Sequence, residues 1–401
     1  MRILIIDTSP IRRGAQVFAF ELATHLKTLG NEVSRVYLFQ FSHHENLPLS
    51  VQDRVLPFRE ESWLEKIPSI QPSLLLDLRR EIAEFQPEVI LCNGSKTLKY
   101  GAWLRILNLA RQAKLVGRFI DDAEFWNPGG LKKQVYSFWI GKFDGLIGVS
   151  QASLQSVQDH YQFTKPARVI HRAFDSSKFR HAPNRLAARN QLGLEEKEEI
   201  LLFLGNLTHQ KRPDRFMDIV SKLIKTRPNL KALIVGDGPL RENLENQVAI
   251  KNQESRDKKQ EKESNSKESI VLNLASYVSF KGYQQDVAPY LAASDLLILT
   301  SDTEGLPGVV LEAAYFGVPT VSTEVGGIKE CLIDGETGFL VPSKSIEDFC
   351  EKIDYLLDHQ GLRKTMGAKA KTFISKNFKM DQVANQYLNF FSSLIHPNSS
   401  K

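Results

Sequence analysis

The feature that most constrains this fold is a repeated alternation of short apolar runs and longer stretches of helical periodicity. A parallel sheet that is buried on both faces needs near-continuous apolar strands, and the intervening helices cover those faces. The alternation stops at a polar stretch and begins again, so we expect two Rossmann-like parallel-sheet α/β domains that face each other across a cleft. The runs that we assign to strands are residues 2–6, 88–92, 114–117, 144–149, 199–204, 231–235, 277–280, 295–299 and 318–321.

The length of 401 residues also favours two domains, because it exceeds what one ordinary hydrophobic core supports. The polar stretch at 176–196 is the expected join, which places an N-terminal domain at 1–180 and a C-terminal domain at 197–378. Within the second domain, residues 251–269 are almost wholly polar, and we expect a mobile surface insertion there because they have little to bury.

The last residues, 379–401, carry an apolar stripe at helical spacing, which predicts a helix that packs onto a core. We expect this terminal crossover helix to pack back on the N-terminal domain. The stripe consists of Val383, Tyr387, Phe390, Phe391 and Leu394.

Composition is that of a globular protein, with 42% hydrophobic and 25% charged residues. No stretch approaches the roughly 20 apolar residues that span a bilayer, and the run at 2–6, followed by Asp7, is typical of a first strand rather than of a signal peptide. The net charge of +5 is spread out, which argues against a nucleic-acid partner. Sparse, widely separated cysteines favour a reducing, cytoplasmic location.

Residues 47–85 have two interpretations. Trp63, Ile67, Ile70 and the leucines at 74–76 lie among basic residues, which is compatible with peripheral association at a membrane surface. Ordinary packing into the core is the interpretation that the pattern favours.

The segment with the clearest chemical meaning follows the predicted strand at 295–299. A polar loop runs to Glu304, and Gly305 to Pro307 lead into a predicted helix, in whose first turn Pro307 is well suited. The N–H groups of Gly308 and Val309 then lack partners within the helix, and such helix starts bind anions.

Two carboxylates flank this predicted anion site: Glu304 lies in the loop, and Glu312 lies about one turn into the helix. Because an ionised carboxylate only accepts hydrogen bonds, the pair indicates a ligand that also offers hydroxyl donors. A sugar nucleotide offers pyrophosphate and hydroxyl groups together. In the alternative interpretation, Glu304 stabilises the helix start and Glu312 faces solvent.

The segment from Phe280 to Pro342 resembles the C-terminal half of retaining family-four glycosyltransferases, which have the two-domain GT-B fold. The resemblance rests on EGLPGVVLEAAYFGVP, which begins at Glu304, and on the blocks at 325–330 and 335–342. Outside residues 40–85 and 251–269 it extends over nearly the whole chain. The further matching blocks are 14–16, 203–212, 236–239 and 280–283.

The resemblance implies a role for each matching position. The catalytic residues are Lys211 and Arg212, which neutralise the diphosphate leaving group, and Glu304, which lies beside the transferred sugar. Glu312 holds the ribose. The other donor-binding positions are Gly14, Asn206, Gly282, Tyr283, Gly305, Leu306, Pro307, Gly308 and Val309.

The N-terminal domain carries the expected acceptor side, at Arg13, Asp121 and Asp122. For the two aspartates, helix capping is the alternative interpretation. This domain departs from the family at Arg13-Gly14, where two glycines are usual, at the sequence HRAFD from His171, and at the aspartates, where many relatives carry a His. Asn206 replaces a common Arg, so either Arg212 substitutes for that Arg or the leaving group has one cation fewer.

The implied reaction transfers a sugar from a UDP- or GDP-sugar to a glycan, a lipid-linked molecule or a small-molecule acceptor. We expect no cofactor and no metal, since Asp121-Asp122 is not the spaced pair of a metal-bridged diphosphate site. A non-catalytic relative that binds a nucleotide sugar, or that partners an active transferase, is the alternative. A nicotinamide-dependent dehydrogenase is disfavoured because no Gly-x-Gly-x-x-Gly follows the first strand.

Overall fold

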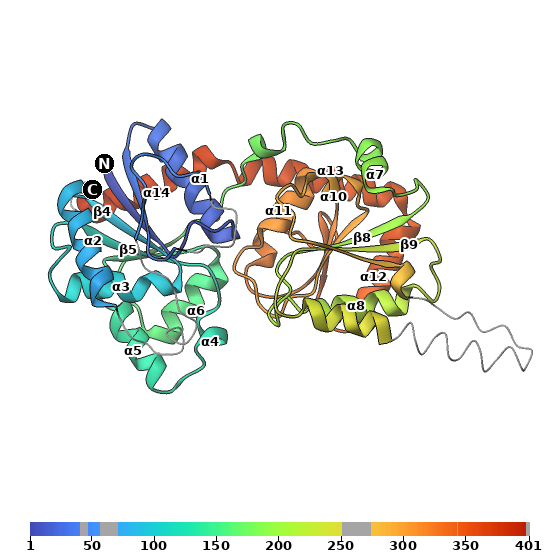
Figure 1. The fold of residues 1–401 in the computed structure, drawn as a ribbon, viewed down its shortest axis with the longest axis horizontal. Helices are drawn as coiled ribbons and strands as arrows, with labels where there is room; N and C mark the ends of the chain where they lie inside the picture. The colour runs from blue at the N-terminus through green and yellow to red at the C-terminus, as the bar shows by residue number, and fades with distance from the viewer. Residues whose placement is uncertain (41–46, 57–70, 251–273, 343, 398–401) are drawn as a thin grey trace, which may run out of the picture. The chain divides into compact units, whose positions relative to one another are not determined.

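The computed structural model describes residues 1–40, 47–56, 71–250, 274–342 and 344–397. The chain forms two compact units, one of Met1–Asp175 with Phe378–Lys401 and the other of Ser176–Asn377 (Figure 1). The predicted insertion at 251–269 lies outside the described residues. Among those described, none of the helices combines the length and the apolar content that crossing a bilayer requires.

The first unit contains a seven-stranded parallel sheet in the order β3-β2-β1-β4-β5-β6-β7. Its strands are β1 (Arg2–Asp7), β2 (Glu32–Tyr37), β3 (Arg54–Val55), β4 (Val89–Asn93), β5 (Lys114–Phe119), β6 (Gly145–Gly148) and β7 (Ala167–Val169). Its helices are α1 (Gly14–Thr28), α2 (Pro72–Phe85), α3 (Ser95–Ile106), α4 (Ala123–Trp126), α5 (Gly130–Ile140), α6 (Gln151–Tyr161) and α14 (Met380–Ile395).

Alternate residues of β1 pack into two cores, one on each face of this sheet. Ile3 and Ile5 lie in a core that α1 and α14 complete. Leu4 and Ile6 lie in the core on the other face, with α2, α3, α5 and α6. Successive side chains of a strand point to opposite faces, so an unbroken apolar strand requires helices on both sides. The last helix therefore packs back on the N-terminal unit, as predicted.

The second unit contains a six-stranded parallel sheet in the order β10-β9-β8-β11-β12-β13. Its strands are β8 (Glu199–Leu204), β9 (Leu230–Val235), β10 (Val278–Gly282), β11 (Leu296–Leu299), β12 (Thr320–Thr323) and β13 (Gly338–Val341). Its helices are α7 (Arg185–Leu192), α8 (Pro213–Leu223), α10 (Ala288–Ala293), α11 (Gly308–Tyr315), α12 (Ile346–Asp358) and α13 (Gln360–Asn377). Helices α8 and α12 share one core with the sheet, and α10, α11 and α13 lie on the side opposite α8 (Figure 1).

Each of the predicted strand runs lies on an observed strand, with ends that differ by at most two residues. The strands that the pattern did not mark are β2, β3, β7 and β13. Within residues 47–85, for which core packing and a membrane surface are the two interpretations, Leu74 and Leu75 are buried in the first unit, whereas Leu76 is exposed. Trp63, Ile67 and Ile70 lie outside the described residues.

Candidate active site

The predicted donor residues other than Gly14 gather where the strand order of the second sheet reverses. From β8 the chain adds β9 and β10 on one side, and then returns to place β11 on the other side. Ligands of open parallel sheets bind at the carboxyl ends of the strands beside such a reversal. Lys211 follows β8 and Glu304 follows β11, so the two loops at this point carry two of the predicted catalytic residues.

Hydrogen bonds join these two loops directly. The Asp302 N–H donates to the Gln210 carbonyl at 2.8 Å, and Gln210 Nε2 donates to the Thr303 carbonyl at 3.0 Å. Thr300 Oγ1 donates to the backbone carbonyl of Lys211 at 3.0 Å. Thr300 Oγ1 also donates to the Arg212 carbonyl at 2.8 Å, so the loop that follows β8 is held to the loop that follows β11 on both sides of the lysine.

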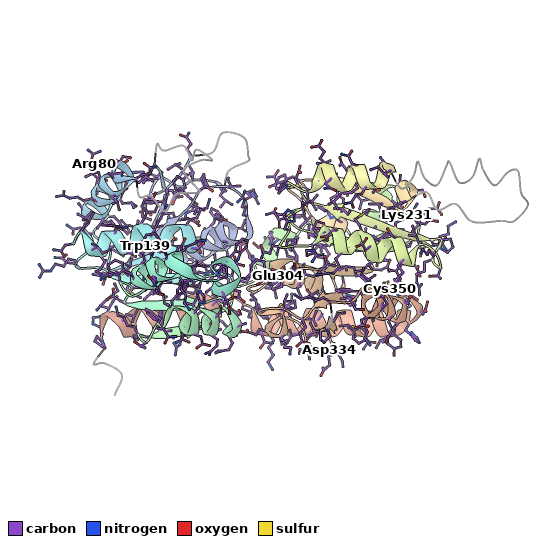
Figure 2. The ribbon with its side chains drawn as sticks, turned by 90° about the horizontal axis from the view of Figure 1, so that it is seen from below. Arg80, Trp139, Lys231, Glu304, Asp334 and Cys350 are labelled. Atoms are coloured by element: carbon purple, nitrogen blue, oxygen red, sulfur yellow. The ribbon has the colours of Figure 1, made fainter. Side chains whose placement is uncertain are left out.

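Lys211 and Glu304 form an ion pair, with 2.6 Å between Nζ and Oε1. Ser301 Oγ donates to the same carboxylate oxygen at 2.6 Å, and the Glu304 side chain is only 5% exposed. Figure 2 labels Glu304 near one end of the second unit. A nearly buried carboxylate needs such partners, so the pair fixes both side chains at the carboxyl edge of the sheet.

The backbone of Glu304 is fixed from the opposite side by Gly326 and Gly327. The Gly327 N–H donates to the Glu304 carbonyl at 3.1 Å. Gly326 has a φ of +52°, and a Cβ there would lie 1.7 Å from that carbonyl oxygen. Only glycine fits this position, which gives a physical reason for the Val-Gly-Gly of the block at 325–330.

Helix α11 begins at Gly308, one residue later than expected, and Pro307 occupies the N-cap position with a φ of −72°. The preceding Gly305 and Leu306 are buried. Gly308 and Val309 are thus the first two helical residues, and their N–H groups have no partner within the helix. The loop and the helix start present backbone donors close in sequence to Glu304, as an anion site requires.

Glu312 lies on α11 and pairs with Lys178, a residue that sequence reasoning missed. Lys178 Nζ lies 2.7 Å from Glu312 Oε1, and the two side chains are 31% and 16% exposed. Lys178 belongs to a short 3-10 helix, Ser176–Phe179, at the beginning of the second unit. No motif marked this lysine, because it meets Glu312 only through the tertiary fold.

Arg212 forms hydrogen bonds with two carboxylates of the second unit. Its guanidinium donates to Asp214 at 2.7 to 3.0 Å and to Asp302 at 3.3 Å. The bonds to Asp214 raise the pKa of Arg212 most, with Asp302 adding to them. Although burial alone would raise the pKa of Asp302, bonds from Arg215 and Arg212 lower it. Arg212 therefore sits in a fixed cluster next to Lys211, where its charge is already shared between two carboxylates.

The other predicted donor positions of the second unit lie along the same carboxyl edge. Asn206 is exposed just after β8, and Gly282 ends β10 with a φ of +65°. Tyr283 follows and is 52% exposed. The Gly236 N–H, after β9, donates to the Gly282 carbonyl at 2.8 Å. Asn206, Gly282 and Tyr283 thus lie on the β10 side of the reversal.

Arg13, Gly14, Asp121 and Asp122 belong to the first unit. Arg13 is exposed at the N-cap of α1, and Gly14 is the first residue of that helix. The Asp122 side chain caps α4 by accepting from the backbone of Glu124 at 2.8 Å, and it accepts from Ser156 Oγ at 2.8 Å. Capping, the alternative interpretation of the aspartate pair, is therefore present at Asp122.

The first sheet has its own reversal, between β1 and β4, and a buried polar network lies there. Asp7, at the end of β1, accepts from Asn93 Nδ2 at 2.8 Å and from Gln16 Nε2 at 3.2 Å. Burial raises the pKa of Asp7 to about 6, although Asn93, the Thr8 N–H, Gln16 and Arg118 oppose the rise. Sequence reasoning passed over Asp7, although a carboxylate directly after an apolar strand was a usable signal.

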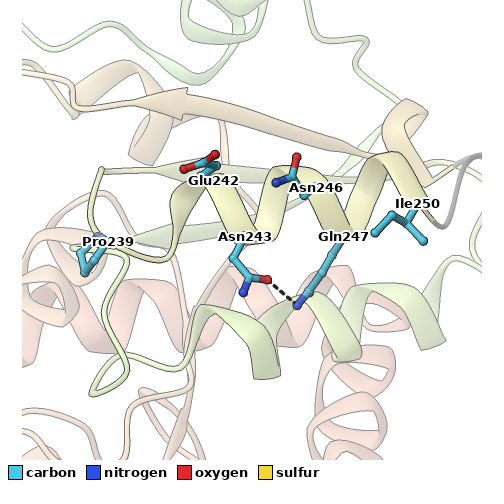
Figure 3. Close-up of a pocket in the computed structure, with 6 residues that line it drawn as sticks. All are labelled: Pro239, Glu242, Asn243, Asn246, Gln247 and Ile250. Carbon is cyan, nitrogen blue, oxygen red and sulfur yellow. Dashed lines mark hydrogen bonds between the residues drawn. The ribbon is translucent and has the colours of Figure 1, made fainter.

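No metal cluster marks a second site in the parts of the chain that the structure describes. Within those residues, no group of three His, Cys, Asp or Glu is placed to hold a metal ion. A shallow hollow on helix 241–250 includes none of the predicted site residues (Figure 3). It is lined by Pro239, Glu242, Asn243, Asn246, Gln247 and Ile250.

Comparison with protein families agrees with this layout. Residues 12–178 match the model described as Glycosyltransferase Family 4, and residues 184–373 match the model described as Glycosyl transferases group 1. The chain belongs to the family-four glycosyltransferases. The boundary between the two matches lies close to the boundary between the two units.

Individual relatives in this family are distant. The chain is 26% identical to N-acetyl-alpha-D-glucosaminyl L-malate synthase of Bacillus anthracis over 66% of its own length and 63% of that protein. It is 28% identical to D-inositol 3-phosphate glycosyltransferase of Streptomyces bingchenggensis over 58% and 49% of the two lengths. The match thus spans less than two thirds of each of these curated relatives.

Solved structures share the fold over nearly the whole chain. Anabaena Alr3699/HepE, in complex with UDP, has a TM-score of 0.75 at 22% identity and covers 98% of this chain and 100% of its own. Sucrose-phosphate synthase from Thermosynechococcus elongatus has a TM-score of 0.79 at 18% identity, over 99% and 100% of the two chains. The GT-B fold that the sequence predicted is confirmed.

Proposed function

We propose that this protein is a retaining glycosyltransferase that moves a sugar from a UDP- or GDP-sugar to an acceptor. The observation that carries the proposal is the Lys211–Glu304 pair, held at the reversal of the second sheet and close in sequence to the start of α11. A cation, a carboxylate and a helix start in one place suit a ligand that combines phosphates with sugar hydroxyls.

In the proposed reaction, the bond between the anomeric carbon and the diphosphate oxygen breaks while the acceptor oxygen bonds to that carbon. The diphosphate leaves with the bonding electrons, and one of its oxygens takes up the proton that the acceptor hydroxyl gives up. Negative charge therefore grows on the leaving group, where Lys211 and the N–H groups of Gly308 and Val309 would stabilise it. We infer that these groups supply the charge stabilisation without a metal.

The carboxylates would orient the donor. Glu304 keeps Lys211 in place and would accept a hydrogen bond from a hydroxyl of the transferred sugar. Glu312 would accept hydrogen bonds from the ribose hydroxyls once its ion pair with Lys178 is broken. Tyr283 is exposed beyond β10, where it could contact the base.

The names of similar proteins and of the ligands in their structures support a nucleotide-sugar donor. They name several different acceptors, so only a broad class of acceptor is proposed. Structures of Anabaena Alr3699/HepE contain UDP or UDP-glucose, which favours UDP as the first nucleotide to test. Relatives are named for L-malate, for D-inositol 3-phosphate and for an undecaprenol-linked glycan. We propose a glycan, a lipid-linked molecule or a small molecule as acceptor, and a cytoplasmic location, which the buried free cysteines suit.

The test is a thermal-shift and hydrolysis panel of UDP, GDP, ADP and their common sugars with purified full-length protein. One nucleotide should raise the melting temperature, because a ligand that binds only the folded state stabilises it. The matching sugar nucleotide should then be turned over, and NMR of the product should show the anomeric configuration of the donor. An inverted product would refute retention, and no binding or turnover across the panel would refute the proposal.

Asn206 favours one second candidate, a relative that binds a nucleotide sugar without turnover, since it stands where the family commonly has Arg. Donor binding without hydrolysis or transfer over a broad acceptor panel would favour this candidate. Asn206→Arg then discriminates further: if the missing cation is the cause, this substitution should restore turnover.

A further inference from the structure

Helices α4 and α5 of the first unit expose four large apolar side chains. Phe125 and Trp126 are 46% and 51% exposed, Leu131 is 76% exposed and Phe138 is 54% exposed. Both helices pack against α6, and they lie at one edge of the unit (Figure 1). Several exposed large apolar side chains on neighbouring elements mark an interaction site more often than a single exposed leucine does.

The fold itself does not require these side chains. Helix α5 already buries Trp139 and Ile140, which are 5% and 0% exposed, in the core of the first unit (Figure 2). Leu131 and Phe138 are two helical turns apart, so they share one face, which is directed away from that core. The outer face of α5 is therefore apolar, and Leu131 and Phe138 on it are exposed.

Lysines border this outer face. Helix α5 contains Lys132 and Lys133 and no carboxylate. Lys132 Nζ donates to the Trp126 carbonyl at 3.3 Å, and Lys142 Nζ lies 4.3 Å from the centre of the Phe138 ring. Both cations are thus held next to an exposed aromatic residue.

Carboxylates also occur nearby, ahead of α5 in the chain. Asp121, Asp122 and Glu124 precede it, and Asp122 is engaged by the start of α4 and by Ser156. Glu124 is exposed on α4. The positive charge is therefore local to α5 and to Lys142, which follows it.

We propose that a basic aromatic face, formed by Trp126, Leu131, Lys132, Phe138 and Lys142, binds the surface of an anionic lipid bilayer. Protein partners fit it less well, because lysine is depleted at protein interfaces. Lysines around exposed Trp, Phe and Leu side chains are the combination that lies at the boundary of headgroups and acyl chains. The proposal goes beyond the transfer reaction and does not depend on it. It also differs from the membrane interpretation of residues 47–85, in which Leu74 and Leu75 are buried.

The test is co-sedimentation of the full chain with vesicles of phosphatidylcholine, with or without phosphatidylglycerol. We expect binding to the anionic vesicles that weakens with salt. Lys132→Glu/Lys142→Glu should bind at least about tenfold more weakly, since each lysine near such a surface contributes about fivefold. Leu131→Ser/Phe138→Ser should also bind at least about tenfold more weakly, because it removes apolar side chains that enter the bilayer surface.

Matched controls lie in the second unit. Leu186 is 62% exposed on α7, and Lys225 and Lys376 are exposed. Leu186→Ser and Lys225→Glu/Lys376→Glu should bind vesicles like the wild type. Circular dichroism and the melting temperature show whether each variant is folded.

Three results would overturn the proposal: no binding to anionic vesicles, equal losses in folded test and control variants, or self-association that Leu131→Ser/Phe138→Ser abolishes without any vesicle binding. The last result would identify a second copy of the chain as the occupant. Donor hydrolysis, measured without vesicles, tests the proposed function separately, so either proposal can fail alone.

Discussion

At the scale of single residues, Lys211 and Glu304 depend on each other. Glu304 is nearly buried, and its carboxylate has Lys211 and Ser301 as partners. Removing one member of such a pair leaves the other short of a partner, so stability and activity both respond. A kinetic test of either residue must therefore also measure folding.

Lys211→Ala should lower kcat by about 10²–10³-fold, the usual cost of losing one group that stabilises developing negative charge. Lys344→Ala is the matched control, because this lysine is 40% exposed and lies 3.6 Å from Asp302 of the same loop. Donor hydrolysis and melting temperature should be measured for both variants. Unchanged turnover in a folded Lys211→Ala protein would remove Lys211 from the mechanism.

Asp7 predicts a pH dependence of stability. Its pKa is about 6 in the folded protein against an ordinary value of 3.8, so the folded state holds the proton more tightly. Unfolding free energy should therefore fall as pH rises from about 4 to 6, and this loss should be complete above that range. The sign is opposite to that of a salt-bridged aspartate.

Asp7→Asn isolates this effect, since asparagine does not titrate. Relative to the variant, the wild type should lose about 1–3 kcal/mol of unfolding free energy between pH 4 and pH 7. Urea unfolding of both proteins at several pH values measures the difference. A difference that does not change with pH would show that Asp7 keeps an ordinary pKa.

At the scale of elements, the 3-10 helix Ser176–Phe179 and helix α11 meet through Lys178 and Glu312. The pair is partly exposed, and such pairs contribute about 0–1 kcal/mol. If Glu312 holds the ribose, Lys178 competes with the donor for that carboxylate. Donor binding would then break the Lys178–Glu312 ion pair, while Phe179 remains stacked on Tyr315 of α11.

Lys178→Ala should raise UDP affinity by up to about fivefold, because it frees Glu312 from a competing cation. Glu312→Ala should lower the affinity by about tenfold or more, because hydrogen bonds to a charged group are lost. Titration calorimetry with UDP measures both, and Lys197→Ala, in an exposed pair with Glu195, is the control. Weaker binding by Lys178→Ala would mean that this lysine contacts the nucleotide itself.

Sequence predicted elements where the signal is local. Buried strands such as β1 and β8 are apolar runs, whereas β3 and β7 are short, partly exposed edge strands without such a run. Glu304 and Glu312 were found through one contiguous motif. The contacts of Glu312 with Lys178 and of Asp7 with Asn93 join residues far apart in the chain, so no local pattern encodes them.

At the scale of the whole molecule, helices that are far apart in the chain pack in the same core. The chain leaves the first unit at Asp175 and returns at Phe378, so α14 completes a core begun by β1 and α1. Arg118, on β5, donates to the hydroxyl of Tyr387 on α14 at 3.0 Å. The core of the first unit is therefore complete only when α14 has packed onto it.

Two separate cores predict two separable unfolding transitions, as multidomain proteins commonly show. Phe391 is fully buried in the first unit and Phe349 is fully buried in the second. Phe391→Ala should destabilise only the first unit, and Phe349→Ala only the second, each by about 3–5 kcal/mol. Scanning calorimetry with and without UDP assigns the transitions, because a nucleotide held by the second unit raises that transition alone. If each substitution lowers a single shared transition equally, the two units unfold as one cooperative body, and the independence inferred from their separate cores is wrong.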